Sequence, residues 1–309
     1  MKVLVTGVNG QLGHDVLREL TRRGHTAIGS GSGSVYKGED RLTALPYVQM
    51  DITNTQGVRT VMHELRPDAV IHCSAWTAVD AAEDIENREK VFALNVEGPR
   101  HIAEASHEVG AKLVYLSTDY VFDGQGTRPW QPDDKNYAPL NYYGQTKLQG
   151  ELAVAQATEC FFIVRIAWVF GKNGKNFIRT MLNVGKTHDT VRVVNDQIGT
   201  PTYTADLARL LVDMVETEKY GYYHATNTET EPGAYISWYD FTCEIFRQAG
   251  MNVRVIPVST AEYGLSKARR PFNSRLDKSK LAEAGFQPLP DWKNALSRYL
   301  AELKGETSL

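Results

Sequence analysis

Cysteine is scarce in this sequence. Only Cys73, Cys160 and Cys243 occur among the 309 residues, and no Cys-x-x-Cys spacing is present. An odd number of widely separated cysteines argues against both a disulfide framework and a zinc site. We expect the three to be small core residues rather than reactive thiols. The eight histidines also show no metal-ligand spacing, so no metal site is predicted.

The chain also lacks dense runs of lysine and arginine, and its formal net charge is −3. Proteins that bind duplex nucleic acid carry a basic face, so nucleic acid is not an expected partner. No hydrophobic run is long enough for a signal peptide or a membrane span, and Met1-Lys2 leads directly into an apolar segment. We therefore expect a cytoplasmic protein with no membrane partner.

Short apolar segments alternate with amphipathic segments along the first 170 residues. The apolar segments are typical of strands buried on both faces, and the others repeat apolar residues at helical spacing. This alternation predicts an α/β fold, a doubly wound parallel sheet with helices on both faces. The expected strands are 2–6, 26–29, 48–50, 69–73, 112–116 and 160–166, and the expected helices are 12–23, 55–65, 87–107 and 142–155.

After residue 170 the alternation becomes irregular, which predicts a smaller C-terminal domain that completes a cleft. We assign 1–170 to a dinucleotide-binding domain, with a return of the chain over 200–225, and 171–309 mainly to a substrate-binding domain. Ser237 followed by Asp240 predicts the capped start of a helix to Ala249. Other helices are expected at 177–184, at 206–216, from 277 and from 292, with a strand at 222–225.

A glycine-rich loop follows the first expected strand. Gly7, Gly10 and Gly13 have the spacing Gly-x-x-Gly-x-x-Gly, and a helix is expected directly after them. Glycines permit the tight turn and let backbone N–H groups approach a pyrophosphate, while the helix N-terminus adds partial positive charge. A glycine pattern alone also fits an ordinary turn, but its place between strand and helix favours dinucleotide binding.

The second expected strand does not end in the acidic residue that normally binds the adenosine ribose. Gly29 and Ser30 stand there instead. An acid would repel the extra phosphate of NADP, so its absence favours NADPH, with NADH as the alternative. Lys37 or Arg41 could reach that phosphate, although both also fit solvated surface charges.

Tyr143 and Lys147 have the spacing of one helical turn and should share a helix face. A nearby ammonium favours the phenolate and is expected to lower the pKa of Tyr143 into a useful range for acid–base work. Thr118, at the end of the fifth strand, offers a hydroxyl for the same carbonyl oxygen. Tyrosine and lysine alone fit an ordinary amphipathic helix, but the glycine loop, Thr118 and the pair together predict a carbonyl reductase.

These motifs resemble those of the extended short-chain dehydrogenase/reductase family and, within it, the dTDP-4-dehydrorhamnose reductases. The resemblance covers nearly the whole chain and is carried by residues 5–13, 76–80, 117–124, 139–147 and 194–202. It implies reduction of the C4 ketone of dTDP-4-dehydro-L-rhamnose to dTDP-L-rhamnose, by a monomer or homodimer acting on a dTDP-sugar. Hydride would come from the nicotinamide and the proton from Tyr143.

The resemblance also implies roles for individual residues. Tyr143, Lys147 and Thr118 would be catalytic, with Lys147 orienting the nicotinamide ribose. Thr118, Asp119, Tyr143 and Trp168 would contact the sugar. The residues expected to bind the cofactor are Gly7, Gly10, Gln11, Leu12, Gly13, Ser30, Asp51, Ile52, Ser74, Ala75, Trp76, Tyr143 and Lys147.

Two other functions fit the same fold. A non-catalytic binding subunit would not need Thr118, Tyr143 and Lys147 together. An epimerase or dehydratase would recycle its cofactor, and the related dehydratases carry Thr-Asp-Glu where this chain has Thr118-Asp119-Tyr120. Arg269 and Arg270 fit either a diphosphate clamp or a solvated loop, and Lys186 and Arg192 are further diphosphate candidates. Trp238 is expected in the core. Trp168 fits either a core position or a stacking contact with the sugar or base.

Overall fold

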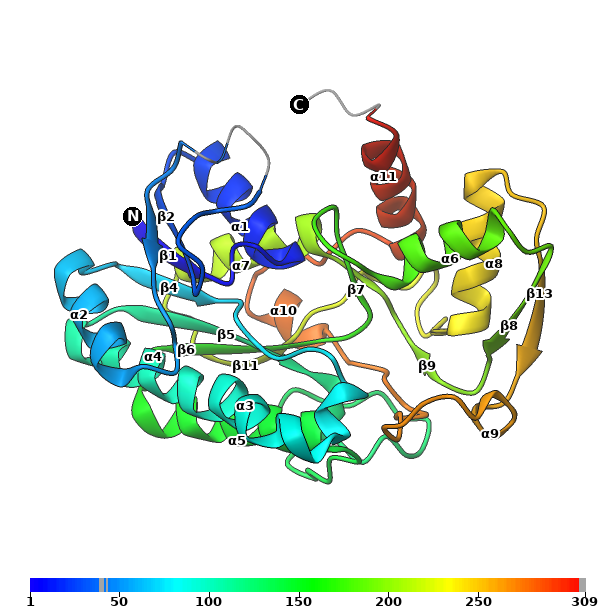
Figure 1. Ribbon diagram of the computed structural model, residues 1–309, viewed down its shortest axis with the longest axis horizontal. Helices are drawn as coiled ribbons and strands as arrows, with labels where there is room; N and C mark the ends of the chain where they lie inside the picture. Colours follow the sequence, from blue (N-terminus) through cyan, green and yellow to red (C-terminus); the bar gives the residue numbers. More distant parts are fainter. Residues whose placement is uncertain (39–41, 43, 306–309) are drawn as a thin grey trace.

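Two lobes lie side by side in the computed structural model, which describes residues 1–38, 42 and 44–305 (Figure 1). The larger lobe is built on a seven-stranded sheet in which every neighbouring pair is parallel. Its strand order is β11-β6-β5-β4-β1-β2-β3, so the order reverses between β1 and β4. The strands are β1 (Lys2–Thr6), β2 (Thr26–Gly31), β3 (Tyr47–Gln49), β4 (Ala69–His72), β5 (Lys112–Thr118), β6 (Phe161–Ile166) and β11 (Gly221–His224).

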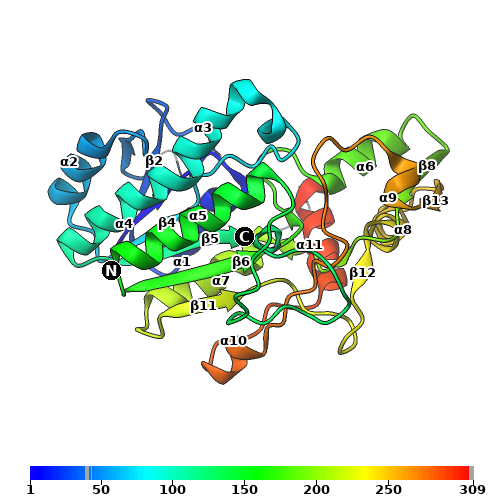
Figure 2. The same cartoon turned by 90° about the horizontal axis from the view of Figure 1, so that it is seen from below.

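Helices cover both faces of this sheet, as Figure 2 shows from below. One apolar core lies under α2 (Thr55–Leu65), α4 (Gly98–Val109) and α5 (Tyr142–Ala157). The second lies under α1 (Gln11–Arg22), α7 (Thr204–Val215) and the short α10 (Ser279–Glu283). Strands buried on both faces need this double cover, which explains their continuous apolar runs. The predicted doubly wound parallel sheet is confirmed.

The smaller lobe has a core of its own, rich in aromatic side chains. Its helix α8 begins with the expected capping box, in which Ser237 and Asp240 exchange side-chain and backbone hydrogen bonds. The elements are α6 (Phe177–Gly185), α8 (Trp238–Ala249), α9 (Thr260–Tyr263), α11 (Trp292–Lys304) and the strand pairs β7 (Val169–Phe170) with β10 (Thr202–Tyr203), β9 (Ile198–Gly199) with β12 (Ile236–Ser237), and β8 (Thr190–Val194) with β13 (Arg254–Val258).

Several local predictions are wrong. The single helix expected over 87–107 is α3 (Arg88–Phe92), a π-helix (Ala93–Glu97) and α4 in succession. Strands β8 and β13 were not expected, because each becomes a strand only through pairing with the other. Cys160 is exposed just before β6 and is not the expected core residue, whereas Cys73 packs against the core of the sheet lobe and Cys243 is half-buried.

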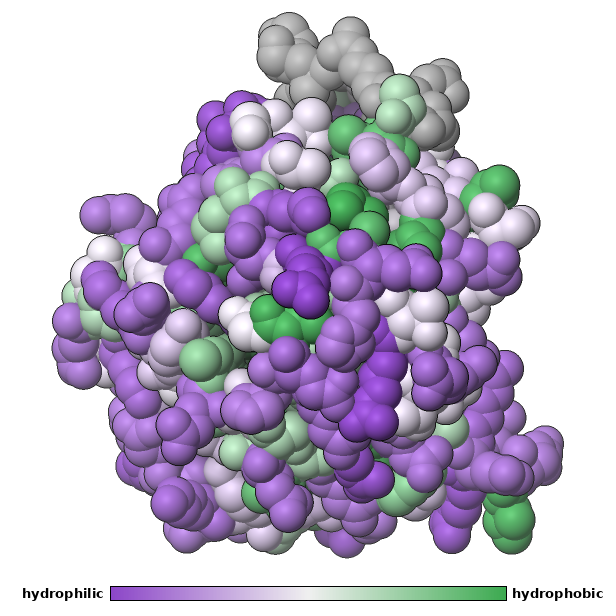
Figure 3. Space-filling view, turned by 90° about the vertical axis from the view of Figure 1, so that its left-hand side faces the viewer, coloured by the Kyte–Doolittle hydropathy of each residue, from purple (hydrophilic) through white to green (hydrophobic). Residues whose placement is uncertain are grey.

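The face on the left of Figure 1 is mainly hydrophilic, with apolar residues scattered among polar ones (Figure 3). In the described part of the chain, no helix is both long enough and apolar enough to span a membrane.

Candidate active site

A cleft of about 810 Å³ opens at the carboxyl ends of β1, β4, β5 and β6 and is lined by residues of both lobes. It lies where the strand order reverses, the usual ligand position in an open parallel sheet. Its size is within the range of small-molecule sites. The cleft therefore contains the reversal point of the sheet, the glycine loop and the Tyr143–Lys147 helix.

The glycine loop forms the cleft wall after β1. All five residues predicted from this loop line the cleft, namely Gly7, Gly10, Gln11, Leu12 and Gly13, and so does Asn9. Gly7 has a φ of 68°, and a Cβ there would come within 2.8 Å of the Cys73 backbone. Helix α1 begins after Gly10 without a side-chain cap and without an acidic residue in its first turn. Its free N–H groups and positive dipole end therefore fit a pyrophosphate.

The structure places most, but not all, of the other predicted cofactor residues in the cleft. Asp51, Ile52, Ser74 and Ala75 line it. Ser30 does not, because its side chain is fully buried in the sheet lobe, and its neighbours Gly31 and Ser32 line the cleft instead.

Trp76 is likewise absent from the cleft lining. Its indole N–H turns away to donate to the Ala78 carbonyl at 2.9 Å. The Asn95 side chain holds the backbone N–H and C=O of Trp76, and the flanking Ala75 and Thr77 face the cleft. The Trp76 ring therefore does not narrow the cleft.

Helix α5 brings Tyr143 and Lys147 to the cleft wall. The helix starts at a regular cap, in which Asn141 Oδ1 accepts the Gly144 N–H at 2.8 Å. The Tyr143 ring packs edge-on against Tyr120, with ring centroids 5.6 Å apart. The cap thus fixes the first turn of the helix, and Tyr120 fixes the direction of the Tyr143 ring.

Lys147 is buried, and its Nζ donates to the Leu116 carbonyl at 2.7 Å and lies 4.1 Å from the centroid of the Tyr115 ring. Burial lowers the pKa of Lys147 to about 7, while Glu151 and Cys73 act in the opposite direction. The ammonium can still donate two further hydrogen bonds toward the cleft that it lines.

Thr118 is the last residue of β5 and Asp119 follows it, and both are buried. Thr118 Oγ1 accepts the Tyr120 N–H at 3.2 Å and donates to Asp119 Oδ1 at 2.9 Å. Burial raises the pKa of Asp119 to about 6, although hydrogen bonds from Ser274 and Thr118 oppose the shift. Asp119 Oδ2 has no hydrogen-bond partner among the described residues and belongs to the cleft wall.

The expected lowering of the Tyr143 pKa is wrong for this structure. Loss of hydration raises the pKa of Tyr143 well above its ordinary value, and the Asp119 carboxyl raises it further. A hydrogen bond with Thr118 lowers it only in part. Lys147 is turned toward Leu116, so its charge does not dominate the phenol. The phenol therefore stays protonated at neutral pH, as a proton donor must be.

Two tryptophans form the wall on the side of the smaller lobe. Trp168 lines the cleft with a left-handed backbone, φ 51°, which is uncommon for a bulky residue. Trp238 stacks on it with ring centroids 3.9 Å apart and also lines the cleft. Trp238 is therefore not simply a core residue, and the pair forms a broad aromatic surface that fits a sugar or a base.

The basic candidates outside the motifs are mostly occupied elsewhere. Arg270 pairs with Asp80 at 2.6 Å, and neither it nor Arg269 lines the cleft. Lys186 and Arg192 do not line it either. Arg41 lies outside the described residues. Sequence reasoning missed Lys175, which does line the cleft. Among the residues described, no group of three or more metal-ligating side chains comes together.

A parallel sheet of this order, with a glycine-rich turn after its first strand and a Tyr-x-x-x-Lys pair facing the same cleft, defines a Rossmann-like protein of the extended short-chain dehydrogenase/reductase class. The chain belongs to the RmlD substrate binding domain family, whose model matches residues 1–304.

Known proteins similar to the chain match it over nearly its whole length. It is 37% identical to the spore coat polysaccharide biosynthesis protein SpsK of Bacillus subtilis, over 97% of both chains. It is 39% identical to a dTDP-4-dehydrorhamnose reductase of Streptomyces griseus, over 98% of this chain and 94% of the other. A crystal structure of dTDP-4-dehydrorhamnose reductase from Bacillus anthracis, in complex with NADP, matches with a TM-score of 0.85 and 40% identity, covering 98% of this chain and all of that one.

Proposed function

We propose that the chain reduces the C4 ketone of dTDP-4-dehydro-L-rhamnose to the alcohol of dTDP-L-rhamnose. The observation that carries the proposal is that the Tyr143 phenol, the Thr118 hydroxyl and Lys147 line the same cleft as the glycine loop. The reductases of Streptomyces griseus and Bacillus anthracis, with 39% and 40% identity, support this substrate.

In this reaction, residues of the chain donate the proton and hold the ketone oxygen in place. When bound in the cleft, NADPH would supply the hydride to the ketone carbon. Tyr143 donates its phenolic proton to the ketone oxygen, and the Thr118 hydroxyl holds that oxygen by a second hydrogen bond. The Lys147 ammonium, which lines the same cleft, would bind the ribose hydroxyls next to the nicotinamide and, through them, favour the phenolate left behind. The Trp168–Trp238 surface positions the sugar nucleotide.

We propose NADPH rather than NADH as the physiological cofactor. The end of β2 presents Gly31 and Ser32 to the cleft, and neither carries a negative charge that would repel a 2′-phosphate. The Bacillus anthracis relative was solved with NADP, which supports the choice. A cytoplasmic location follows from the supply of reduced cofactor.

Another nucleoside-diphosphate 4-ketosugar is a second candidate substrate. The observation that favours it is the 37% identity to SpsK, a protein of spore coat polysaccharide biosynthesis. Dehydration is disfavoured because Tyr120, packed against Tyr143, stands where a dehydratase carries its glutamate. We therefore propose ketone reduction as the reaction and, within it, the precursor of dTDP-rhamnose as the preferred substrate.

The test is a panel of nucleoside-diphosphate 4-ketosugars, each assayed for loss of NADPH and NADH absorbance and for the alcohol product. We expect net oxidation of NADPH, fastest with dTDP-4-dehydro-L-rhamnose. Faster turnover of another ketosugar would replace the substrate and keep the reaction. Product formation without net cofactor oxidation would identify an epimerase or dehydratase. No turnover by folded protein that still binds cofactor would favour a non-catalytic subunit.

A further inference from the structure

A loop of the smaller lobe, residues 171–176, reaches across the cleft to the glycine loop of the sheet lobe. The Asn173 side chain donates from Nδ2 to the Asn9 carbonyl at 2.9 Å and to the Gly10 carbonyl at 3.4 Å. These two carbonyls belong to the glycine loop, and both of their residues line the cleft. The loop is thereby attached to the wall that is proposed to hold the cofactor pyrophosphate.

Asn176 holds the other end of the same loop. Its Nδ2 donates to Gln11 Oε1 at 3.0 Å, to Tyr299 Oη at 2.8 Å and to the Gly171 carbonyl at 2.9 Å. Its Oδ1 accepts the Arg179 N–H and caps α6. One side chain therefore connects the start of α1, the start of α6 and the last helix. Both ends of the loop are fixed, so the residues between them have a defined place.

Lys175 lies between these two anchors and lines the cleft. Among the described residues of the cleft lining, only Lys147 and Lys175 carry a positive charge. Lys147 lies at the Tyr143 end of the cleft and donates to the Leu116 carbonyl. Lys175 lies at the other end, because the preceding residue, Gly174, is next to Gln11 of helix α1. Of the two lysines in the described lining, Lys175 is therefore the one in the loop that is bonded to the glycine loop.

We infer that Lys175 binds the pyrophosphate of the dinucleotide, so that the smaller lobe supplies a cofactor-binding residue as well as the sugar site. The inference rests on the proposed function only in that it requires a dinucleotide in the cleft. A pyrophosphate carries about two negative charges, and the uncapped start of α1 offers it only a partial positive charge. The Lys175 ammonium supplies a full one, and the cofactor would thus link the two lobes.

The experiment measures the dissociation constants of NADPH and NADH for the wild-type chain, Lys175→Gln, Lys175→Arg and Lys186→Gln. Lys186 directly follows α6 as its C-cap and does not line the cleft, so it is the matched control. We expect Lys175→Gln to weaken both dinucleotides by the same factor, about fivefold to tenfold at low salt. Lys175→Arg should retain most of the affinity, and Lys186→Gln all of it. The ratio of the Lys175→Gln dissociation constant to that of the wild type should approach one near 1 M salt, where charges are screened within about 3 Å.

Any other result would overturn the inference, and each would assign Lys175 a different role or none. Weakening of NADPH alone would place Lys175 at the 2′-phosphate. Weaker binding of dTDP, measured with the same variants, together with unchanged NADH binding would place it at the substrate diphosphate. Equal affinities for Lys175→Gln and wild type would remove its role. Failure of the wild-type chain to bind either dinucleotide would instead reject the proposed function itself.

Discussion

At the scale of single residues, the phenol of Tyr143 carries the proposed chemistry. We expect Tyr143→Phe to lower kcat by about 10² to 10⁴, because the ketone oxygen then lacks its proton donor. Cofactor affinity should change little, since the glycine loop is untouched. Stopped-flow or steady-state loss of NADPH absorbance gives kcat, and a fluorescence titration gives the NADPH dissociation constant.

Tyr142→Phe is the control for this variant. Tyr142 is the neighbouring residue of α5, but its hydroxyl donates to the Arg88 carbonyl and its ring does not line the cleft. Its loss should leave kcat within a factor of about two. A Tyr143→Phe enzyme that kept wild-type turnover would show that another group donates the proton.

Lys147 gives the site a pH dependence. Its pKa of about 7 is depressed by burial, so the ammonium is present below that pH and is lost as pH rises through it. Because the ammonium is the form that binds the ribose, kcat/KM for NADPH should fall on the alkaline side of a pKa near 7. A rate profile over pH 5 to 9 measures this.

Lys147→Met should abolish that alkaline limb along with most activity. The variant also removes the contact with Leu116, so thermal unfolding must be compared first. A kcat/KM profile for the wild type that stayed flat or rose from pH 6 to pH 9 would contradict the assignment.

The order of motifs along the chain was enough to predict Thr118, Tyr143 and Lys147 as neighbours, because strand ends and the α5 face meet at one sheet edge. It was not enough to predict where individual side chains turn. Ser30 and Trp76 sit in the correct segments, yet one faces the interior and the other turns to Ala78. Trp238 could be placed only by its stacking on Trp168, a contact across 70 residues of sequence.

At the scale of elements, α5 must approach the sheet closely to deliver Tyr143 and Lys147. Gly150 makes this approach possible, since a Cβ there would overlap the Asn95 carbonyl and the Tyr115 hydroxyl. Gly150→Ala should therefore destabilise the fold by about 1 to 3 kcal/mol, although alanine is the better helix former. It should also lower kcat by moving α5. Urea unfolding and turnover measure the two effects.

Gln149→Ala on the exposed side of α5 is the matched control and should change stability by less than about 0.5 kcal/mol. If Gly150→Ala were as stable and active as wild type, the close contact between α5 and the π-helix at 93–97 would not be needed for the site.

The contact between α5 and the π-helix at 93–97 also explains why this π-helix was not predicted from the sequence. Apolar residues over 87–107 keep a helical period, so one continuous helix was expected. The π-helix at Ala93–Glu97 instead directs the Asn95 amide to Trp76 and to Thr146 of α5. Such a π-helical turn depends on partners distant in sequence, so the local pattern of apolar residues does not predict it.

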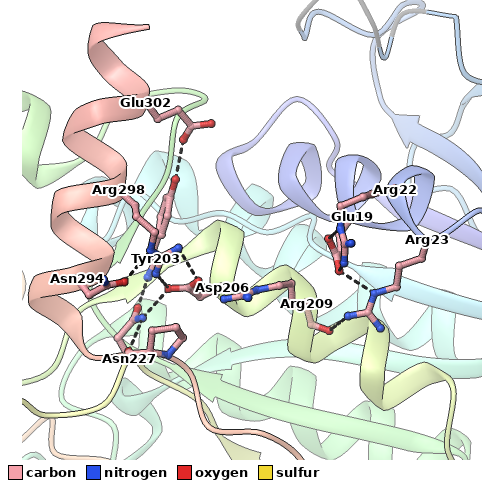
Figure 4. Close-up of polar contacts among 11 residues, drawn as sticks. Glu19, Arg22, Arg23, Tyr203, Asp206, Arg209, Asn227, Asn294, Arg298 and Glu302 are labelled. Carbon is pink, nitrogen blue, oxygen red and sulfur yellow. Dashed lines mark hydrogen bonds and ion pairs between the residues drawn. The ribbon is translucent and has the colours of Figure 1, made fainter. Parts of the chain in front are cut away.

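At the scale of the whole molecule, the last helix fastens the smaller lobe to the sheet lobe. Figure 4 shows Arg298 of α11 directed at the buried carboxylate of Asp206 in α7, at 2.9 and 2.6 Å. In the same view, Tyr203 donates to Glu302 of α11 at 2.7 Å. Arg18 of α1 reaches the other Glu302 oxygen at 2.8 Å. Helix α11 is thus bound to both helices that flank the glycine-loop side of the sheet.

This junction holds a second buried acid, Asp15 of α1, which accepts from Thr204 of α7. Burial raises the pKa of Asp15 to about 6, and nearby Glu302 adds to the shift, while Thr204 and Arg18 oppose it. A raised pKa means that the folded state holds its proton more tightly than the unfolded state. The associated stability is fully present below about pH 4 and is lost as pH rises through about 6.

Asp15→Asn removes this titration and keeps an acceptor for Thr204. The free energy of unfolding of the variant minus that of wild type should therefore rise by about 3 kcal/mol between pH 4 and pH 7.5, the size of a shift of about two pKa units. Urea unfolding across that range measures the difference, and Glu302→Gln should narrow the window because it removes one cause of the raised pKa. A difference that did not change with pH would mean that Asp15 is hydrated in the native protein and that the junction between the lobes is open to water.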